Sequence, residues 1–166
     1  TINDFRDFFS PDKVMTTFSA LAQIRQAIAL VESGFKANNI ALSVEGEGDC
    51  RVKGFPNEYS QVLLNLLGNA KDAILQHRPD SGRVVVSLDV EQGRGVARVR
   101  DNGGGVPEEI IDKIFDPYFS TKSMGTGIGL YMSKTIIERN MNGAISVRNI
   151  DDGCEFSVAL PLAEQP

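Results

Sequence analysis

Residues 65–72 read Asn-Leu-Leu-Gly-Asn-Ala-Lys-Asp and lie inside a segment, Asn57 to His77, whose apolar residues have helical spacing. The spacing predicts one long helix. At 3.6 residues per turn, the side chains of Asn65, Asn69 and Asp72 fall within about 60° of one another. This polar stripe lies beside an apolar arc formed by Val62, Leu63, Leu66, Ala70, Ala73 and Ile74.

Oxygen-bearing side chains beside a buried face need partners, because burying one without a partner costs on the order of 1 to 3 kcal/mol. A single Asn in such a place bonds locally or faces water. Three such residues in register favour a shared ligand instead. Amide and carboxylate oxygens suit Mg²⁺, which keeps water and phosphate oxygens for its other positions.

The segments around the long helix predict a mixed α and β chain. Strands are expected at 13–18, 40–44, 51–55, 84–90, 96–100, 144–149 and 154–160, and further helices from Ser19 to about 34–39, at 108–114 and at 127–142. Three hairpins are expected: the strand at 40–44 with that at 51–55, 84–90 with 96–100, and 144–149 with 154–160. With few strand-helix-strand crossovers, the pattern favours the α+β class, as a two-layer sandwich with a mixed, mostly antiparallel sheet covered on one face by helices.

The composition limits the function further. The 166 residues, 42% hydrophobic and 23% charged, are typical of one globular domain rather than a disordered region. The longest run without a charge, Tyr59 to Ala70, has 12 residues, whereas a membrane span needs about 20. The net charge of −5 argues against nucleic-acid binding. Cys50, Cys154 and His77 form neither a disulfide framework nor a metal-ligand pattern. A cytoplasmic domain without direct membrane contact is expected, and the first residue, Thr1, indicates a piece of a longer protein.

A second candidate site is the run Asp101-Asn102-Gly103-Gly104-Gly105 at the end of an expected strand. A carboxylate beside bare glycine backbone can accept a hydrogen bond from a planar donor such as the edge of an amino-purine. Asp-Asn-Gly is equally common in ordinary turns, so both interpretations stay open.

A third candidate is Gly125-Thr126-Gly127-Ile128-Gly129-Leu130, which leads into an expected helix. Alternate glycines at a helix start expose backbone N–H groups to an anion. The run lacks the Lys-Ser/Thr pair of a P-loop and the preceding strand of a dinucleotide fingerprint. Before it lies Phe115-Asp116-Pro117-Tyr118-Phe119-Ser120-Thr121-Lys122, an aromatic-rich segment that by itself also fits a surface turn with inward Phe side chains.

Taken in their order along the chain, 65–72, 101–105, 115–122 and 125–130, these four segments resemble the N, G1, F and G2 boxes of sensor histidine kinases. The resemblance extends from about Pro11 to Pro161, and its Asn-Ala-x-Asp-Ala and Phe-Ser-Thr-Lys sequences are similar to the nitrogen-regulation subgroup. It implies the Bergerat ATP-binding fold, shared with gyrase, a heat-shock chaperone and mismatch-repair ATPases. It also implies that residues 1–10 end a dimerisation-hairpin helix and that residues 11–166 form the catalytic domain.

The resemblance implies ATP and Mg²⁺ as cofactors and assigns their site. Asn69 would bind Mg²⁺, Asn65 and Asp72 would line the triphosphate side, and Asp101 would accept the adenine amino group. The remaining ATP-site residues would be Gly103, Gly105, Phe115, Lys122, Gly125, Thr126, Gly127, Ile128, Gly129 and Leu130, with Lys122 in a mobile lid.

By the same resemblance, the domain would pass the γ-phosphoryl group of ATP to a histidine on the dimerisation hairpin of the same protein. A response regulator receiver domain would be an indirect partner. The expectation of a cytoplasmic domain is compatible with a parent protein that is anchored in a membrane. No catalytic residue is expected in this chain, because the acceptor histidine and its base would lie upstream. His77 follows the long helix without an acidic neighbour after it and is expected at the surface.

Two positions depart from the family pattern. Asn65 stands where hydrolysing relatives have a Glu that activates water, and an amide cannot act as that base. Cys154 follows Gly153 where the family often has Thr, a stronger hydrogen-bonding group. Two alternatives stay open: a serine kinase of the anti-sigma type with the same fold, and a non-catalytic nucleotide-binding module.

Overall fold

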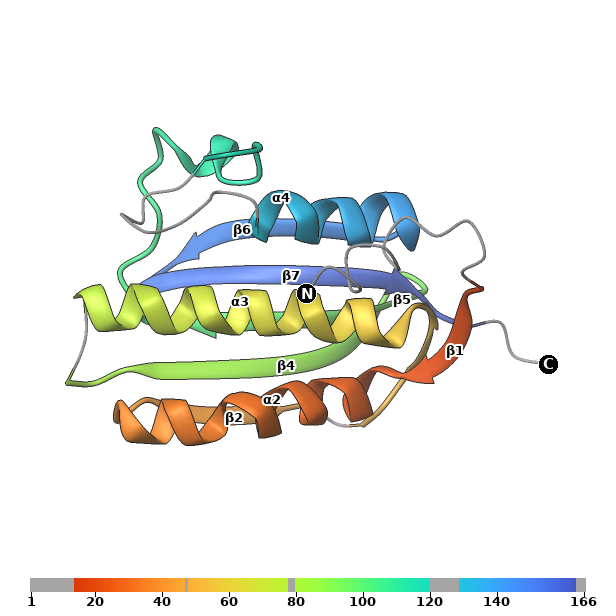
Figure 1. Ribbon diagram of the computed structural model, residues 1–166, viewed down its shortest axis with the longest axis horizontal. Helices are drawn as coiled ribbons and strands as arrows, with labels where there is room; N and C mark the ends of the chain where they lie inside the picture. The colour runs from red at the N-terminus through yellow and green to blue at the C-terminus, as the bar shows by residue number, and fades with distance from the viewer. Residues whose placement is uncertain (1–13, 47, 78–79, 120–128, 164–166) are drawn as a thin grey trace.

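The computed structural model describes residues 14–46, 48–77, 80–119 and 129–163. Helices lie on one face of a five-stranded sheet with the strand order β2-β4-β5-β7-β6, and β1 pairs with β3 in a separate two-stranded sheet (Figure 1). In the large sheet β2 and β4 are parallel and all other neighbours are antiparallel. The expected α+β sandwich is confirmed. Residues 1–10, expected to end a hairpin helix, lie outside the described residues.

The element bounds are as follows. The strands are β1 (Thr16–Ser19), β2 (Ala41–Glu45), β3 (Arg51–Gly54), β4 (Arg83–Glu91), β5 (Arg94–Asp101), β6 (Ala144–Ile150) and β7 (Gly153–Pro161). The helical elements are α2 (Ala20–Ala37), α3 (Pro56–His77), the 3-10 turn η1 (Ile111–Lys113) and α4 (Gly129–Lys134), which continues as the π-helical η2 (Thr135–Asn140).

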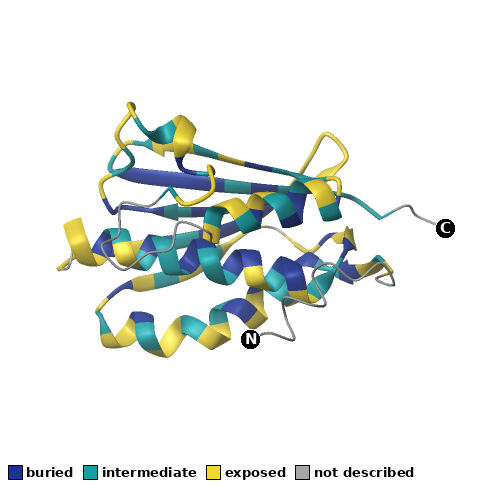
Figure 2. Cartoon of the chain, turned by 45° about the horizontal axis from the view of Figure 1, so that its top comes forward, coloured by how far each residue is buried: buried dark blue, intermediate teal, exposed yellow. Residues whose placement is uncertain are grey.

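The central helix α3 supplies much of the core. Its predicted apolar arc is buried except for Ala73, which is half-buried, and Leu66 and Ile74 are fully inaccessible. They join a cluster that includes Val84 and Val86 of β4 and Phe156 of β7. Figure 2 shows the same division along the helices, with buried faces turned to the sheet and exposed faces turned away. Because burying one such aliphatic side chain stabilises the fold by roughly 1.5–3 kcal/mol, the rotation of α3 about its axis is fixed.

The start of α2 is capped by two segments of the chain. The hydroxyl of Ser19 accepts the N–H of Ala22 at 3.0 Å and donates to Asp49. Asp49 also accepts the N–H of Leu21 at 3.0 Å. Burial would raise the pKa of the Asp49 carboxyl, but these hydrogen bonds outweigh it and lower the pKa. Ser19 is therefore the N-cap of the helix that the sequence predicts to start at this residue.

The expected hairpin between the strands at 40–44 and 51–55 is wrong. β2 pairs with β4 instead, and β3 pairs with β1. The intervening loop, whose glycines resemble a hairpin turn, delivers Asp49 to the start of α2 and does not close a turn. β3 then leads into α3, which crosses the sheet before β4, so that β2 and β4 run in the same direction.

The other expected elements are confirmed with changes at their ends. The hairpins β4–β5 and β6–β7 form as predicted. The helix expected at 108–114 is a single 3-10 turn. The helix expected at 127–142 is described from Gly129, becomes π-helical at Thr135 and ends at Asn140, two residues before Asn142, whose φ of 54° is left-handed.

Candidate functional site

The candidate site lies along α3, with a glycine segment against each end of the polar stripe. A Cβ added to Gly103 would lie 2.8 Å from the Cβ of Ala73. A Cβ added to Gly129, the first residue of α4, would lie 2.7 Å from Oδ1 of Asn65. Only glycine permits the first approach, because the backbone of Ala73 and Ile74 lies equally close, whereas a side chain at Gly129 would displace the Asn65 amide. Asn65 and Ala73 are about 12 Å apart along the helix axis, and Asn69 lies between them; α4 itself runs beside α3 (Figure 1).

Asp101 ends β5 and is the buried carboxylate of this site, with 6% of its surface exposed. Its Oδ1 accepts the N–H of Gly103 at 2.8 Å, and no Lys or Arg of the described ranges forms an ion pair with it. Burial raises the pKa of this carboxyl, and the backbone N–H groups of Gly103 and Cys154 offset only part of the rise. A desolvated acceptor without a cation is typical of a ligand-binding position.

The β7 side of Asp101 is equally tight. A Cβ on Gly153 would collide with the carbonyl oxygen of Asp101. Cys154 lies opposite Asp101 in the strand pairing and is 4% exposed. Burial, together with the charges of Asp101 and Glu155, raises the pKa of the Cys154 thiol to about 12. The residue that replaces the family's Thr is therefore a neutral thiol.

Two Asn side chains, whose roles sequence reasoning missed, fix the glycine loop that follows Asp101. Asn102 accepts the N–H of Arg83 and donates to the carbonyl of Ser81, both at 2.8 Å. Asn149 of β6 accepts the N–H of Val106 at 2.8 Å and donates to its carbonyl at 2.7 Å. Asn102 lies in the run 101–105 that the sequence marks as a candidate site. Asn149 has no local sequence signal, because its partner Val106 is 43 residues away.

A second contact missed by the sequence joins α3 to α4. The amide nitrogen of Asn65 donates to the hydroxyl of Ser133 at 3.0 Å, and Ser133 is 2% exposed. This bond orients the Asn65 amide, with its Oδ1 toward Gly129. In the rest of the stripe, Asn69 is half-buried and Asp72 is exposed.

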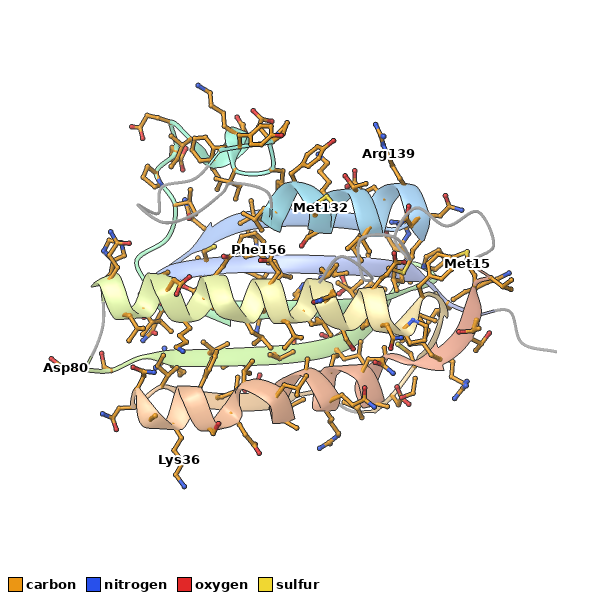
Figure 3. The ribbon with its side chains drawn as sticks, viewed as in Figure 1. Met15, Lys36, Asp80, Met132, Arg139 and Phe156 are labelled. Carbon is orange, nitrogen blue, oxygen red and sulfur yellow. The ribbon has the colours of Figure 1, made fainter. Side chains whose placement is uncertain are left out.

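The remaining predicted site residues divide into three groups. Gly105 has a φ of 77° and lies against Asn149 within the fixed loop. Phe115 packs edge-on against Phe156 of β7 (labelled in Figure 3), with the ammonium of Lys134 5.6 Å from its ring, and Leu130 packs on the core. Phe115 is therefore anchored inward. The predicted residues outside the described ranges are Lys122, Gly125, Thr126, Gly127 and Ile128.

Other features of the described ranges bear on function. They contain no cluster of three or more His, Cys, Asp or Glu side chains arranged to hold a metal. His77 is exposed, as predicted, near Gly104. None of the helices in these ranges combines the length and hydropathy that crossing a bilayer requires.

Known proteins resemble this chain over most of its length. Residues 54–164 match the family described as histidine kinase-, DNA gyrase B-, and HSP90-like ATPase. The chain is 36% identical over 154 residues to the two-component sensor PprA of Pseudomonas aeruginosa. The matched region covers 88% of this chain but only 16% of PprA. The solved catalytic domain of histidine kinase ThkA superposes with a TM-score of 0.81 at 31% identity, covering 90% of this chain and 96% of that one. A structure of ThkA in complex with the response regulator protein TrrA gives a TM-score of 0.77 at 27% identity and covers 98% and 46% of the two chains.

The burial of Asp101 predicts a gain in stability when its charge is removed. Its folded-state pKa is raised, so the folded domain binds a proton more tightly than the unfolded chain, and this carboxyl lowers the free energy of unfolding as pH rises through the interval between the two pKa values. Asp101→Asn should raise the unfolding midpoint of the ligand-free domain at pH 7 by roughly 1 to 4 °C. The gain should shrink as the pH falls toward 4.

Thermal unfolding at pH 7 and pH 4 measures both effects. The exposed Asp112→Asn, on η1, is the matched control and should change the midpoint little at either pH. A lower midpoint for Asp101→Asn at pH 7 would show that the bond from Gly103 outweighs the cost of burial.

Proposed function

Because this chain belongs to the histidine kinase-, DNA gyrase B- and HSP90-like ATPase family, as the ATP-binding catalytic domain of a two-component sensor kinase, we propose that its parent protein transfers the γ-phosphoryl group of Mg-ATP to a histidine. The acceptor histidine would lie on a dimerisation hairpin of the same protein. The observation that carries the site assignment is Asp101, a buried carboxylate at the foot of a glycine loop packed on α3, with which no Lys or Arg of the described part of the chain pairs.

Asp101 would accept the adenine amino group, since its Oδ1 already holds the loop and the carboxylate has further acceptor capacity. Gly103 and Gly105 would admit the base beside α3. On the triphosphate side we assign Asn65, Asn69 and Asp72 from α3, with Gly125, Gly127 and Gly129 presenting N–H groups to phosphate and Thr126, Ile128, Leu130 and Lys122 completing that side. Phe115 supports the site through its contact with Phe156.

The described residues fit a Mg²⁺ ion held mainly by the nucleotide. They offer no multi-carboxylate cage, but Asn69 is a half-buried amide midway along the stripe. Mg²⁺ typically takes one or two protein ligands beside phosphate oxygens and water, so we assign Asn69 as its protein ligand. When bound, the ion neutralises charge on the triphosphate.

The chain's own contribution to the reaction is positioning. Asn65 donates its amide hydrogen to Ser133 and has no proton-accepting carboxylate, so it cannot activate water. ATP would thus be held without rapid hydrolysis until the acceptor histidine arrives. A response regulator would receive the phosphoryl group afterwards; a relative, ThkA, has been solved in complex with one.

Replacing Asn69 by Ala should weaken ATP binding in Mg²⁺ much more than binding of metal-free ATP. We expect at least a tenfold loss of affinity with Mg²⁺ and a loss of threefold or less with EDTA, measured by calorimetry. Gln61→Ala, an exposed position on the same helix, is the control. Equal losses in both conditions would show that Asn69 is structural.

Radiolabel from γ-labelled ATP tests the reaction itself. The isolated domain should remain unlabelled, including at His77, and should hydrolyse ATP only slowly. Adding the dimerisation hairpin should give acid-labile label on that hairpin, as expected of a phosphorylated histidine. Acid-stable label on a serine would indicate the anti-sigma type of kinase, and rapid hydrolysis by the domain alone would contradict the role given to Asn65. ATP binding without transfer to the hairpin would favour a non-catalytic module.

A further inference from the structure

The face of the sheet opposite the helices carries a cluster of charged side chains on its last three strands. Because side chains alternate along a strand, the neighbours of the buried Val99, Phe156 and Ile145 point to this open face. A hollow of about 480 Å³ lies there. We call it the arginine hollow; its central residues are Arg98 and Arg100 of β5, Glu155 and Ser157 of β7, and Ser146 and Arg148 of β6.

Glu155 organises this hollow. It is only 2% exposed although it lies on the open face, because arginine side chains cover it. Its carboxylate accepts Nε–H of Arg100 at 2.5 Å and Nε–H of Arg148 at 2.7 Å. Burial would raise the pKa of this carboxyl, but the two arginines outweigh it and lower the pKa, so Glu155 is a charged structural anchor.

The way in which the arginines bind Glu155 leaves their outer edges available. A guanidinium has five N–H donors, and Arg100 and Arg148 each bind Glu155 through Nε. Within the described ranges neither arginine pairs with a second carboxylate. Arg98 differs, because its Nη1 pairs with Glu91 at 2.5 Å and lies 3.6 Å from Asp89. Arg98 also approaches Glu155, with its Nε 3.8 Å from the carboxylate. The charged residues that line the hollow, Glu91, Arg98, Arg100, Arg148 and Glu155, carry a net charge of +1, and guanidinium edges of this kind fit carboxylates.

The geometry points to the arginine hollow as a docking site for an acidic segment of a protein partner, whose Asp or Glu carboxylates would bind the free edges of Arg100 and Arg148. The exposed hydroxyl of Ser146 and the half-buried one of Ser157 offer hydrogen bonds to a polypeptide backbone beside these charges. Asp89 and Glu91 pair with Arg98 on one flank, so the hollow offers two spaced guanidiniums and not the continuous basic stripe typical of a nucleic-acid interface.

The docking site and the nucleotide site lie back to back. The row Arg100, Glu155 and Arg148 is one residue along each strand from the row Asp101, Cys154 and Asn149. Successive residues point to opposite faces of a sheet, so a segment docked in the hollow does not occupy the nucleotide site. Binding at the hollow should therefore persist when ATP is saturating.

A hexaglutamate peptide is the probe, with hexaglutamine as its neutral counterpart, titrated into the isotope-labelled domain in excess Mg-ATP. We expect shifts of the Arg100 and Arg148 Nε–H signals in nuclear magnetic resonance spectra, with binding weakened by salt. Arg148→Gln should weaken binding at least tenfold. The double variant Glu155→Gln/Arg148→Gln should do the same although the net charge is unchanged and no buried carboxylate loses its partners.

Arg139→Gln is the matched control, since it removes one positive charge from η2, where the side chain points outward from the helical layer (Figure 3). It should bind hexaglutamate as the unmodified domain does, and all variants should keep their affinity for ATP. The proposal would be overturned if the double variant bound hexaglutamate as tightly as the unmodified domain does. It would also be overturned if the unmodified domain bound hexaglutamine as tightly as hexaglutamate, or did not bind hexaglutamate. Inorganic phosphate binding at the same arginines as tightly as hexaglutamate would overturn it in favour of a small-anion site.

Discussion

The contact on which the site depends is the approach of two glycine segments to one helix. Gly103 packs against the Cβ and backbone of Ala73, where no side chain fits, and Gly129 packs against the amide of Asn65, which a side chain there would displace. Both contacts depend on the rotation of α3, which is fixed by its apolar arc on the sheet. The core that stabilises the domain therefore also sets the positions of the polar stripe, the loop after β5 and the start of α4. A change in how Leu66 or Ile74 packs would alter all three together.

Two buried carboxylates on opposite faces of the sheet show how environment separates roles. Within the described ranges no Lys or Arg pairs with Asp101, and its pKa is raised, so its charge is costly in the ligand-free domain and is available to a ligand. Glu155 is gathered by Arg100 and Arg148, its pKa is lowered, and it holds those side chains in place. Cys154 pairs with Asp101 across the strands and precedes Glu155 in β7, and the charges of both carboxylates add to burial in keeping its thiol neutral.

Much of the fold and of the candidate site could be predicted from local sequence patterns. The long helix, its apolar arc and the two later hairpins follow from periodicity, and Asp101 follows from its place at a strand end before glycines. The pairing of β2 could not be predicted. A loop with Gly46 and Asp49 fits a hairpin turn locally, whereas the actual use of Asp49 as a cap for α2 is a contact with another segment.

The contacts that support the site were missed for a related reason. Asn149 and Ser133 each bond a residue far away in the sequence, 43 and 68 positions respectively, so no local motif marks them. Such tertiary hydrogen bonds position the residues that motifs do identify. Sequence patterns thus mark the candidate site residues, whereas the residues that hold them in place are found only in the fold.

The central claim is that Asp101 accepts a hydrogen bond from the amino group of adenine. Guanine carries a carbonyl oxygen at that ring position, which a carboxylate would repel. Calorimetry with Mg-ATP and Mg-GTP tests the claim most directly. ATP should bind at least tenfold more tightly than GTP, since losing this hydrogen bond costs about 1 to 3 kcal/mol, and Asp101→Asn should reduce the ratio to about threefold or less. Equal affinity of the unmodified domain for the two nucleotides would contradict the account.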